Sequence, residues 1–238
     1  MADGSHTVKR AVILAAGKGE RLNPVTLKTP KPLIRVNGVR IIETIINALH
    51  KNGIYEIYVV TGYLKEQFEE LKEDFPDIKL IENPYYDSCN NISSLYVARD
   101  HLEEAIILDG DQMIHNPDVL TPFFEISGYN ASWCAKDTDE WLLEVSDGII
   151  KSCSRTGGKN GYRLYSISRW TAKDGAKLGR YIEEEFGRGN TSIYWDDVPM
   201  FCFFKEFKLG IMEIKEEDVT EIDNLYELQA IDSRYNNL

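Results

Sequence analysis

The chain has 238 residues, of which 43% are hydrophobic and 28% are charged, and its formal net charge is −12. This length and composition are typical of one globular domain with a full core. The acidic charge argues against a nucleic acid partner, because the phosphate backbone is also negative. The chain contains no run of 18 apolar residues and no hydrophobic N-terminal block, so neither a membrane span nor a secretion signal is expected.

The cysteines form neither a CxxC pair nor the spacing of a metal site. We therefore expect a cytoplasmic protein with reduced thiols at Cys89, Cys134, Cys153 and Cys202. Residues 1–8 are mainly polar and are predicted to form a disordered segment, followed by one domain over residues 9–238.

Strand and helix patterns alternate through the first half of the chain. The predicted strands are Lys9–Leu14, Tyr55–Val60, Asp77–Ile81 and Ala105–Leu108. The predicted helices are residues 41–49, which end before Gly53, Leu64–Leu71 and Ile92–His101. Strands separated by helices of this length indicate right-handed crossovers and a parallel, doubly wound α/β sheet.

The pattern changes after residue 127, where short strands follow one another with little helix between them. The predicted elements are strands at Tyr129–Ala135, Trp141–Val145, Ile149–Ser154, Tyr162–Ser168 and Ile211–Ile214, a long helix at Thr171–Phe186 and a terminal helix from Asn224. We expect this β-rich half to complete a mixed sheet and to cover a pocket within the same domain.

The first predicted strand opens a glycine-containing stretch, "AVILAAGKGERLNP". A dinucleotide-binding fingerprint would need a third glycine where Leu22 stands, and an acidic residue after the second strand, which is absent. A Walker loop is absent as well. The remaining phosphate-binding pattern is a glycine loop with a basic residue and a distant lysine, and Gly17, Gly19, Arg21 and Lys31 match it.

Each of these residue types suits a phosphate ligand. Glycines let backbone N–H groups approach phosphate oxygens, and the guanidinium of Arg21 can hold two oxygens at once. The prolines on either side of Lys31 favour extended backbone, which would hold the lysine out stiffly. A plain tight turn and a surface lysine are the alternatives, but the combination after a buried strand favours phosphate binding.

The stretch "LAAGKGERL…TPKPL" resembles the signature of nucleotidyltransferases that load nucleoside triphosphates onto small phosphates. From "VVTGYLKEQFEEL" through "LDGDQMI" and "YWDD" to "EIDNLYEL", the chain is similar to the bacterial CTP:phosphocholine cytidylyltransferases. The resemblance covers residues 9–235. It implies a Rossmann-like nucleotidyltransferase fold and transfer of CMP from CTP to phosphocholine, with catalytic roles for Arg21 and Lys31 and nucleotide contacts at Leu14, Ala15, Ala16, Gly17 and Gly19.

The resemblance also implies a Mg²⁺ cofactor held by Asp111 in "LDGDQ" and Asp196 in "YWDD", with Asp109 and Asp197 as the neighbouring alternatives. Mg²⁺ prefers oxygen ligands and is usually held by one or two carboxylates together with substrate phosphates. The acceptor phosphate is already an anion near neutral pH, so the reaction needs positioning and charge stabilisation rather than a general base.

Recognition of the cytosine base is expected from polar side chains near two predicted helices. They offer the donors and acceptors that a base edge needs, although a helix cap is the alternative for each: Tyr63, Asn90, Asn91, Ser93 and Ser94.

The acceptor pocket is predicted from aromatic residues that stand beside carboxylates. A quaternary ammonium binds aromatic faces and negative charge, which predicts a cage of Trp141, Tyr194 and Trp195 with the carboxylates Glu140, Glu221 and Asp223. The same cage could hold the primary ammonium of 2-aminoethylphosphonate or phosphoethanolamine, whereas a sugar phosphate fits less well. Arg155 either meets the acceptor phosphate or belongs to a simple hairpin turn. A binding domain without catalysis is disfavoured, because Lys31 and both metal aspartates are present.

Overall fold

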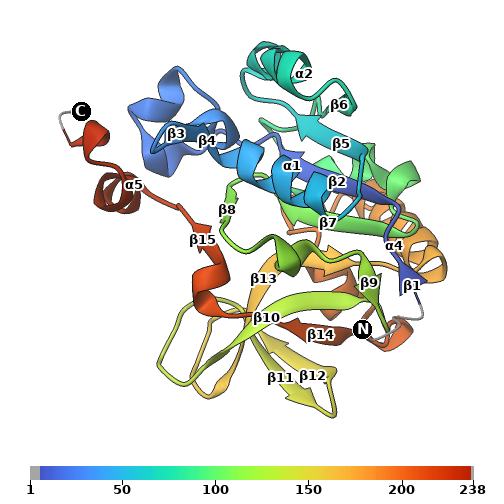
Figure 1. The fold of residues 1–238 in the computed structure, drawn as a ribbon. Helices are drawn as coiled ribbons and strands as arrows, with labels where there is room; N and C mark the ends of the chain where they lie inside the picture. The colour runs from blue at the N-terminus through green and yellow to red at the C-terminus, as the bar shows by residue number, and fades with distance from the viewer. Residues whose placement is uncertain (1–5, 237–238) are drawn as a thin grey trace.

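The computed structural model describes residues 6–236, which build a nine-stranded mixed sheet with helices on both faces (Figure 1). The strands are β1 (His6–Thr7), β2 (Arg10–Ala15), β3 (Arg35–Val36), β4 (Val39–Arg40), β5 (Glu56–Thr61), β6 (Ile78–Glu82), β7 (Ala105–Asp109), β8 (Gln112–Ile114), β9 (Phe123–Phe124), β10 (Gly128–Cys134), β11 (Leu142–Ser146), β12 (Ile149–Ser154), β13 (Gly161–Arg169), β14 (Gly210–Glu213) and β15 (Val219–Glu221). The helices are α1 (Ile41–Lys51), α2 (Leu71–Asp74), α3 (Ile92–Val97), α4 (Ala172–Gly187) and α5 (Leu225–Ile231). No helix within residues 6–236 is both long and apolar enough to cross a membrane.

The strand order in the large sheet is β10-β14-β12-β11-β13-β7-β2-β5-β6. Strands β7, β2, β5 and β6 are mutually parallel, whereas β13 is antiparallel to β7 and joins the β-rich second half to this parallel part. The predicted α/β architecture with a mixed sheet is thus confirmed. Because the carboxyl ends of β2 and β7 lie side by side, the residues that follow them meet at one edge of the sheet.

Strand β2 is buried on both faces, which explains its continuous apolar sequence. Ala11, Ile13 and Ala15 pack into one hydrophobic core with α1 and α2, whereas Val12 and Leu14 pack into a second core with α3 and α4. Successive side chains of a strand point to opposite faces, so one short strand anchors both helix layers.

Two predicted helices are shorter than expected. The segment predicted as Leu64–Leu71 is a 3₁₀ segment at Lys65–Glu70 followed by the single turn of α2, because Leu64 has a left-handed backbone with φ of 48°. The helix predicted as Ile92–His101 divides into α3 and a 3₁₀ turn at Arg99–His101.

The predicted disordered segment, residues 1–8, is only partly within the described chain, because residues 1–5 lie outside it. For the remaining three residues the prediction is wrong. His6 and Thr7 form β1 against β9, and Val8 is buried with its N–H donating to the carbonyl of Pro122. An apolar Val8 beside a paired strand gains enough burial to order this part of the chain.

The C-terminal segment crosses from the β-rich half to the side of the molecule that carries β3 and β4 (Figure 1). Strand β15 pairs with β8, and α5 then packs near the 3₁₀ turn at Glu20–Leu22. The carboxylate of Asp232 accepts from the N–H of Asn37 at 2.8 Å, and the hydroxyl of Tyr235 donates to the carbonyl of Arg35 at 2.8 Å. These contacts hold the end of the chain beside the glycine loop.

The last residue of β13, Arg169, is buried and bonded to three uncharged oxygens. Its guanidinium donates to the carbonyls of Thr121 at 2.8 Å and Val119 at 2.6 Å, and to Oδ1 of Asn130 at 2.6 Å. Burial lowers the pKa of Arg169, yet an arginine stays protonated at neutral pH. The side chain therefore ties the turn after β8 to β10 and β13.

We predict that Arg169→Met lowers the free energy of unfolding by about 2–3 kcal/mol, because buried oxygen acceptors lose their donor. Chemical denaturation monitored by tryptophan fluorescence measures the change. Arg180→Met on the exposed face of α4 is the control, with an expected change within about 0.5 kcal/mol. Equal effects of the two substitutions would contradict the structural role of Arg169.

Candidate active site

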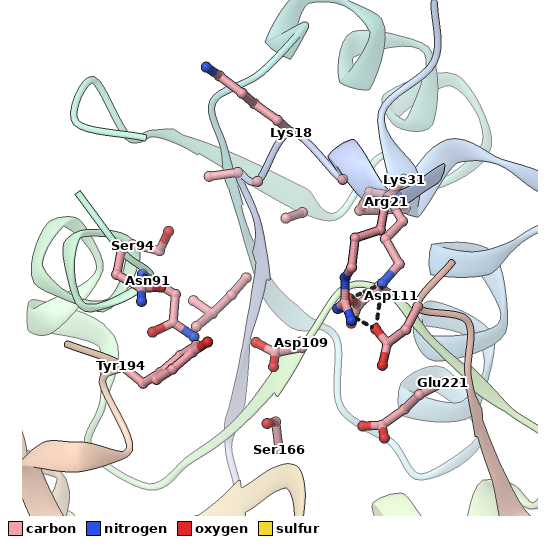
Figure 2. Close-up of a pocket in the computed structure, with 18 of the residues that line it drawn as sticks. Lys18, Arg21, Lys31, Asn91, Ser94, Asp109, Asp111, Ser166, Tyr194 and Glu221 are labelled. Carbon is pink, nitrogen blue, oxygen red and sulfur yellow. Dashed lines mark hydrogen bonds and ion pairs between the residues drawn. The ribbon is translucent and has the colours of Figure 1, made fainter. Parts of the chain in front are cut away.

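A cleft of about 720 Å³ opens at the carboxyl ends of β2 and β7. It brings together segments from the glycine loop, α3, β13 and the C-terminal end of the chain (Figure 2). The residues predicted from the sequence that line this cleft are Leu14, Ala15, Ala16, Gly17, Gly19, Arg21, Lys31, Asn90, Asn91, Ser94, Asp111, Glu140, Trp141, Tyr194, Asp196, Glu221 and Asp223.

The two glycines of the loop are there for different reasons. Gly19 has a positive φ of 63°, and a Cβ there would lie 3.1 Å from Cβ of Lys31 and from Cγ2 of Thr26. The folded chain therefore requires glycine at position 19. Gly17 has no positive φ, and a Cβ there would meet no atom within 4 Å. Nothing in the protein requires glycine at position 17, and its bare backbone faces the cleft.

Lys31 is buried and lies in a turn, rather than being held out stiffly by extended backbone as the sequence analysis predicted. It begins a 3₁₀ turn, Lys31–Leu33, with its side chain only 8% exposed. Its Nζ lies 2.6 Å from Oδ2 of Asp111 and 3.2 Å from Oδ1 of Asp223 (Figure 2). Burial alone would lower the pKa of Lys31, but the two carboxylates outweigh burial and raise it. The extended conformation predicted for Lys31 is therefore wrong, because the turn carries its ammonium to these carboxylates.

Arg21 reaches the same carboxylate from the exposed side of the loop. Its Nη2 donates to Oδ1 of Asp223 at 3.0 Å, so one oxygen accepts from both Arg21 and Lys31. The side chain of Arg21 is 70% exposed, which leaves it free to turn toward a ligand in the cleft. The two basic residues predicted to be catalytic thus lie together.

Two further carboxyl groups of the cleft, Asp109 and Asp196, do not pair with these cations. Asp109, at the end of β7, points toward Ser166 in Figure 2. The surrounding protein and the charges of Asp111 and Asp196 hold the pKa of Asp109 well above its usual range. Burial raises the pKa of Asp196 to about 7, and its Oδ1 has no hydrogen-bond partner among the described residues. A cation in the cleft would stabilise the ionised form of both carboxyl groups.

Asp111 and Asp223 are the carboxylates that could hold a divalent metal ion, since they already share the ammonium of Lys31. The sequence analysis paired Asp111 with Asp196, whose unpartnered buried Oδ1 also suits a cation. Among the described residues, no three His, Cys, Asp or Glu side chains are placed to hold a metal ion. The donor set therefore fits Mg²⁺ that takes its remaining ligands from substrate phosphates and water.

Two of the predicted base-binding residues, Tyr63 and Ser93, form hydrogen bonds within the protein next to the cleft. The hydroxyl of Tyr63 donates to the carbonyl of Thr26 at 3.0 Å, and its N–H donates to the carbonyl of Ala16. Ser93 is buried, accepts from the amide of Asn83 and donates to the carbonyl of Asn90. Neither side chain lines the cleft. The prediction that Tyr63 and Ser93 contact the base directly is therefore replaced by a role in holding the neighbouring backbone.

The predicted aromatic cage contains two rings rather than three. The rings of Trp141 and Tyr194 meet edge to face, with centroids 5.9 Å apart, and both line the cleft. Trp195 is completely buried and packs against Tyr129 and Trp170 in the core. The prediction that Trp195 belongs to the cage is therefore wrong, because its ring gains more by burial beside these two rings.

Glu140 and Glu221 are linked through Arg163, and in Figure 2 Glu221 lies across the pocket from Tyr194, on the side of Lys31. Arg163 from β13 binds Glu221 at 2.6 Å and lies 3.8 Å from Glu140, and Gln112 donates to Glu221 at 2.8 Å. Burial raises the pKa of Glu221, against the opposing effects of Gln112 and Arg163.

The sequence analysis missed several residues that line the cleft: Lys18, Glu20, Leu22, Pro32, Asp87, Leu164 and Ser166. Lys18 stands between the two glycines of the loop, and this position could have indicated a role. It forms an ion pair with Asp87. Leu164 and Ser166 lie on β13 without any local signal, since only the sheet order brings them to the cleft.

Comparison with known proteins shows the family to which the chain belongs. The family model described as "MobA-like NTP transferase domain" matches residues 11–168. The 2-aminoethylphosphonate cytidylyltransferase of Lancefieldella rimae is 38% identical over 98% of this chain and 96% of its own length. The choline-phosphate cytidylyltransferase of Streptococcus pneumoniae is 31% identical over 94% of this chain and 96% of its own.

Solved structures show the same architecture. The structure of CTP:phosphocholine cytidylyltransferase from Streptococcus pneumoniae aligns with a TM-score of 0.85 at 31% identity, over 96% of this chain and 99% of that one. The inositol-1-phosphate CTP transferase of T. maritima aligns with a TM-score of 0.78 at 19% identity, over 97% and 94%, and supports the fold alone. The chain belongs to the MobA-like NTP transferase family and is a nucleotidyltransferase.

Proposed function

We propose that this enzyme transfers CMP from CTP to a small phosphonate or phosphate that carries an amine, with release of pyrophosphate. The carrying observation is a single cleft lined by two chemically different groups of residues. Gly17, Arg21 and Lys31 suit phosphates, and the ring pair of Trp141 and Tyr194 with the neighbouring Glu140 suits an organic cation. Similarity over 98% and 94% of this chain to cytidylyltransferases named for 2-aminoethylphosphonate and choline phosphate supports the proposed transfer of CMP to such an acceptor.

In the proposed reaction, an oxygen of the acceptor attacks the α-phosphorus of CTP. A new oxygen–phosphorus bond forms as the bond between the α-phosphorus and the oxygen bridging to the β-phosphate breaks, and pyrophosphate carries away the electron pair. The attacking group is already an anion, so no side chain has to remove a proton. Arg21 and Lys31 would stabilise the charge that develops on the phosphates, and the loop around Gly17 would orient them.

Mg²⁺ is the proposed cofactor, with Asp111 as a ligand and either Asp223 or Asp196 as the second carboxylate. When bound, it would offset the charge of the triphosphate and the acceptor, which otherwise repel each other. Lys31 contacts one oxygen of each of Asp111 and Asp223, so the second oxygen of each carboxylate is the one that would face the metal ion.

A primary ammonium, as in 2-aminoethylphosphonate, is the acceptor that the cleft supports best. Such a group donates three hydrogen bonds and needs oxygen acceptors, and the cleft offers those of Glu140, which precedes Trp141 in the chain, and of Glu221. The relative at 38% identity has this substrate in its name. Phosphocholine is the second candidate, because the pair of Trp141 and Tyr194 offers aromatic surface to a quaternary ammonium.

We predict pyrophosphate release from CTP and Mg²⁺ with 2-aminoethylphosphonate, and at least about tenfold lower kcat/KM with phosphocholine, since each 1.4 kcal/mol of lost hydrogen bonding is tenfold. Phosphoethanolamine and glucose 1-phosphate complete the series, and omission of Mg²⁺ tests the cofactor. Turnover of glucose 1-phosphate alone would contradict the ammonium site. A preference for phosphocholine would favour the second candidate.

We predict that Gly17→Ala raises the KM for CTP by about tenfold or more, because the added methyl group occupies space needed by phosphate oxygens. The melting temperature should not fall, since the methyl group meets no protein atom. Gly187→Ala at the end of α4 is the matched control, because its added Cβ also meets nothing within 4 Å. An unchanged KM in Gly17→Ala would place the phosphates elsewhere.

We predict that Asp111→Asn lowers kcat at least about 100-fold at saturating CTP, because the neutral amide is a poor Mg²⁺ ligand. Thermal unfolding checks that the variant is folded. Asp118→Asn, at an exposed turn outside the cleft, should keep the kcat of the unchanged enzyme. Full activity of Asp111→Asn would refute the metal-binding role.

A further inference from the structure

The turn between β12 and β13 places a cation behind the aromatic end of the cleft. Arg155 follows the last residue of β12, and its turn is fixed by a two-way backbone bridge between Thr138 and Gly158. This bridge holds the turn against the chain that leads into Trp141. Arg155 itself does not line the cleft.

The guanidinium of Arg155 contacts three neighbours at once. It lies 3.8 Å from the ring centroid of Phe201 and 5.9 Å from that of Trp141, and it forms an ion pair with Asp197. The rings of Phe201 and Trp141 also meet edge to face at 5.6 Å. A planar guanidinium can stack on rings and bind a carboxylate together, which an ammonium does less well.

Asp197 connects Arg155 to the backbone of Tyr194. It is only 4% exposed, and its Oδ2 accepts from the backbone N–H of Tyr194 at 2.9 Å. The next N–H, that of Trp195, donates to Oδ1 of Asn91 at 2.9 Å. The segment that carries Tyr194 is therefore held from one side by Asn91 and from the other by Asp197 and Arg155.

We propose that Arg155 is a positioning residue that sets the acceptor specificity of the cleft by fixing Trp141 and Tyr194 relative to each other. The inference rests on the proposed function, because it concerns the acceptor end of that site. The charge of Arg155 is balanced by Asp197. Arg155 would therefore affect acceptor binding through the position of the Trp141 and Tyr194 rings and not through its own charge. Without Arg155, Asp197 keeps a buried charge with no cation, and Phe201 and Trp141 lose their stacking partner.

The test compares steady-state constants for CTP and 2-aminoethylphosphonate in the full chain, measured by pyrophosphate release. Arg155→Met should raise the KM for the acceptor about tenfold, the scale expected for a displaced ring wall, and leave the KM for CTP within about twofold. Arg155→Lys should recover the acceptor KM only in part, because lysine keeps the ion pair and lacks the planar group.

Arg99→Met is the matched control. Arg99 also lies over an aromatic ring, that of Tyr96 at 4.5 Å, and pairs with Glu183 at 3.5 Å, but it does not line the cleft or touch its ring pair. It should leave both KM values unchanged. A merely structural role for Arg155 would raise both KM values together or leave both unchanged, and either result overturns the inference. Absence of turnover by the unchanged enzyme with every acceptor would instead refute the proposed function, and the inference with it.

Discussion

The ammonium group of Lys31 joins three parts of the chain that are far apart in sequence. It belongs to the segment after the glycine loop, whereas its partners Asp111 and Asp223 follow β7 and β15. An unpaired charge at this buried position would cost several kcal/mol, so the two carboxylates are required in the nucleotide-free state. Gly19 completes the arrangement, because its missing Cβ makes room for the side chain of Lys31. The loop, the sheet edge and the C-terminal segment are thus placed by one charge cluster.

The charges that line the cleft determine how this acidic protein could bind a triphosphate. Among residues 6–236, eight carboxyl groups and three cationic side chains line the cleft, so carboxyl groups outnumber cations there. Burial, together with the nearby charges of Asp111 and Asp196, holds the pKa of Asp109 well above its usual range. A triphosphate that entered alone would meet net repulsion. The same carboxylates become favourable when a divalent cation accompanies the nucleotide, which is the physical reason to propose Mg²⁺ as cofactor.

Sequence patterns predicted the parts of the structure that depend on neighbouring residues. The strand before the glycine loop, the alternation of strands and helices and the loop itself are local features, and the structure contains them. Tyr63 and Ser93 carry suitable polar atoms, but tertiary hydrogen bonds to Thr26 and Asn83 consume these atoms. Ser166 reaches the cleft only because β13 lies beside β7, and strand order cannot be read from a strand's own residues.

The neighbours Tyr194 and Trp195 show why adjacency in sequence does not define an aromatic cage. Tyr194 is 49% exposed, whereas Trp195 is fully buried, so one of the pair faces the cleft and the other the core. With Trp195 in the core, the proposed acceptor site depends more on its carboxylates. Glu221 is already held by Arg163 and Gln112, so its oxygens are oriented before any ligand arrives. Oriented oxygens favour a group that donates directed hydrogen bonds, and a primary ammonium does this while a quaternary ammonium does not.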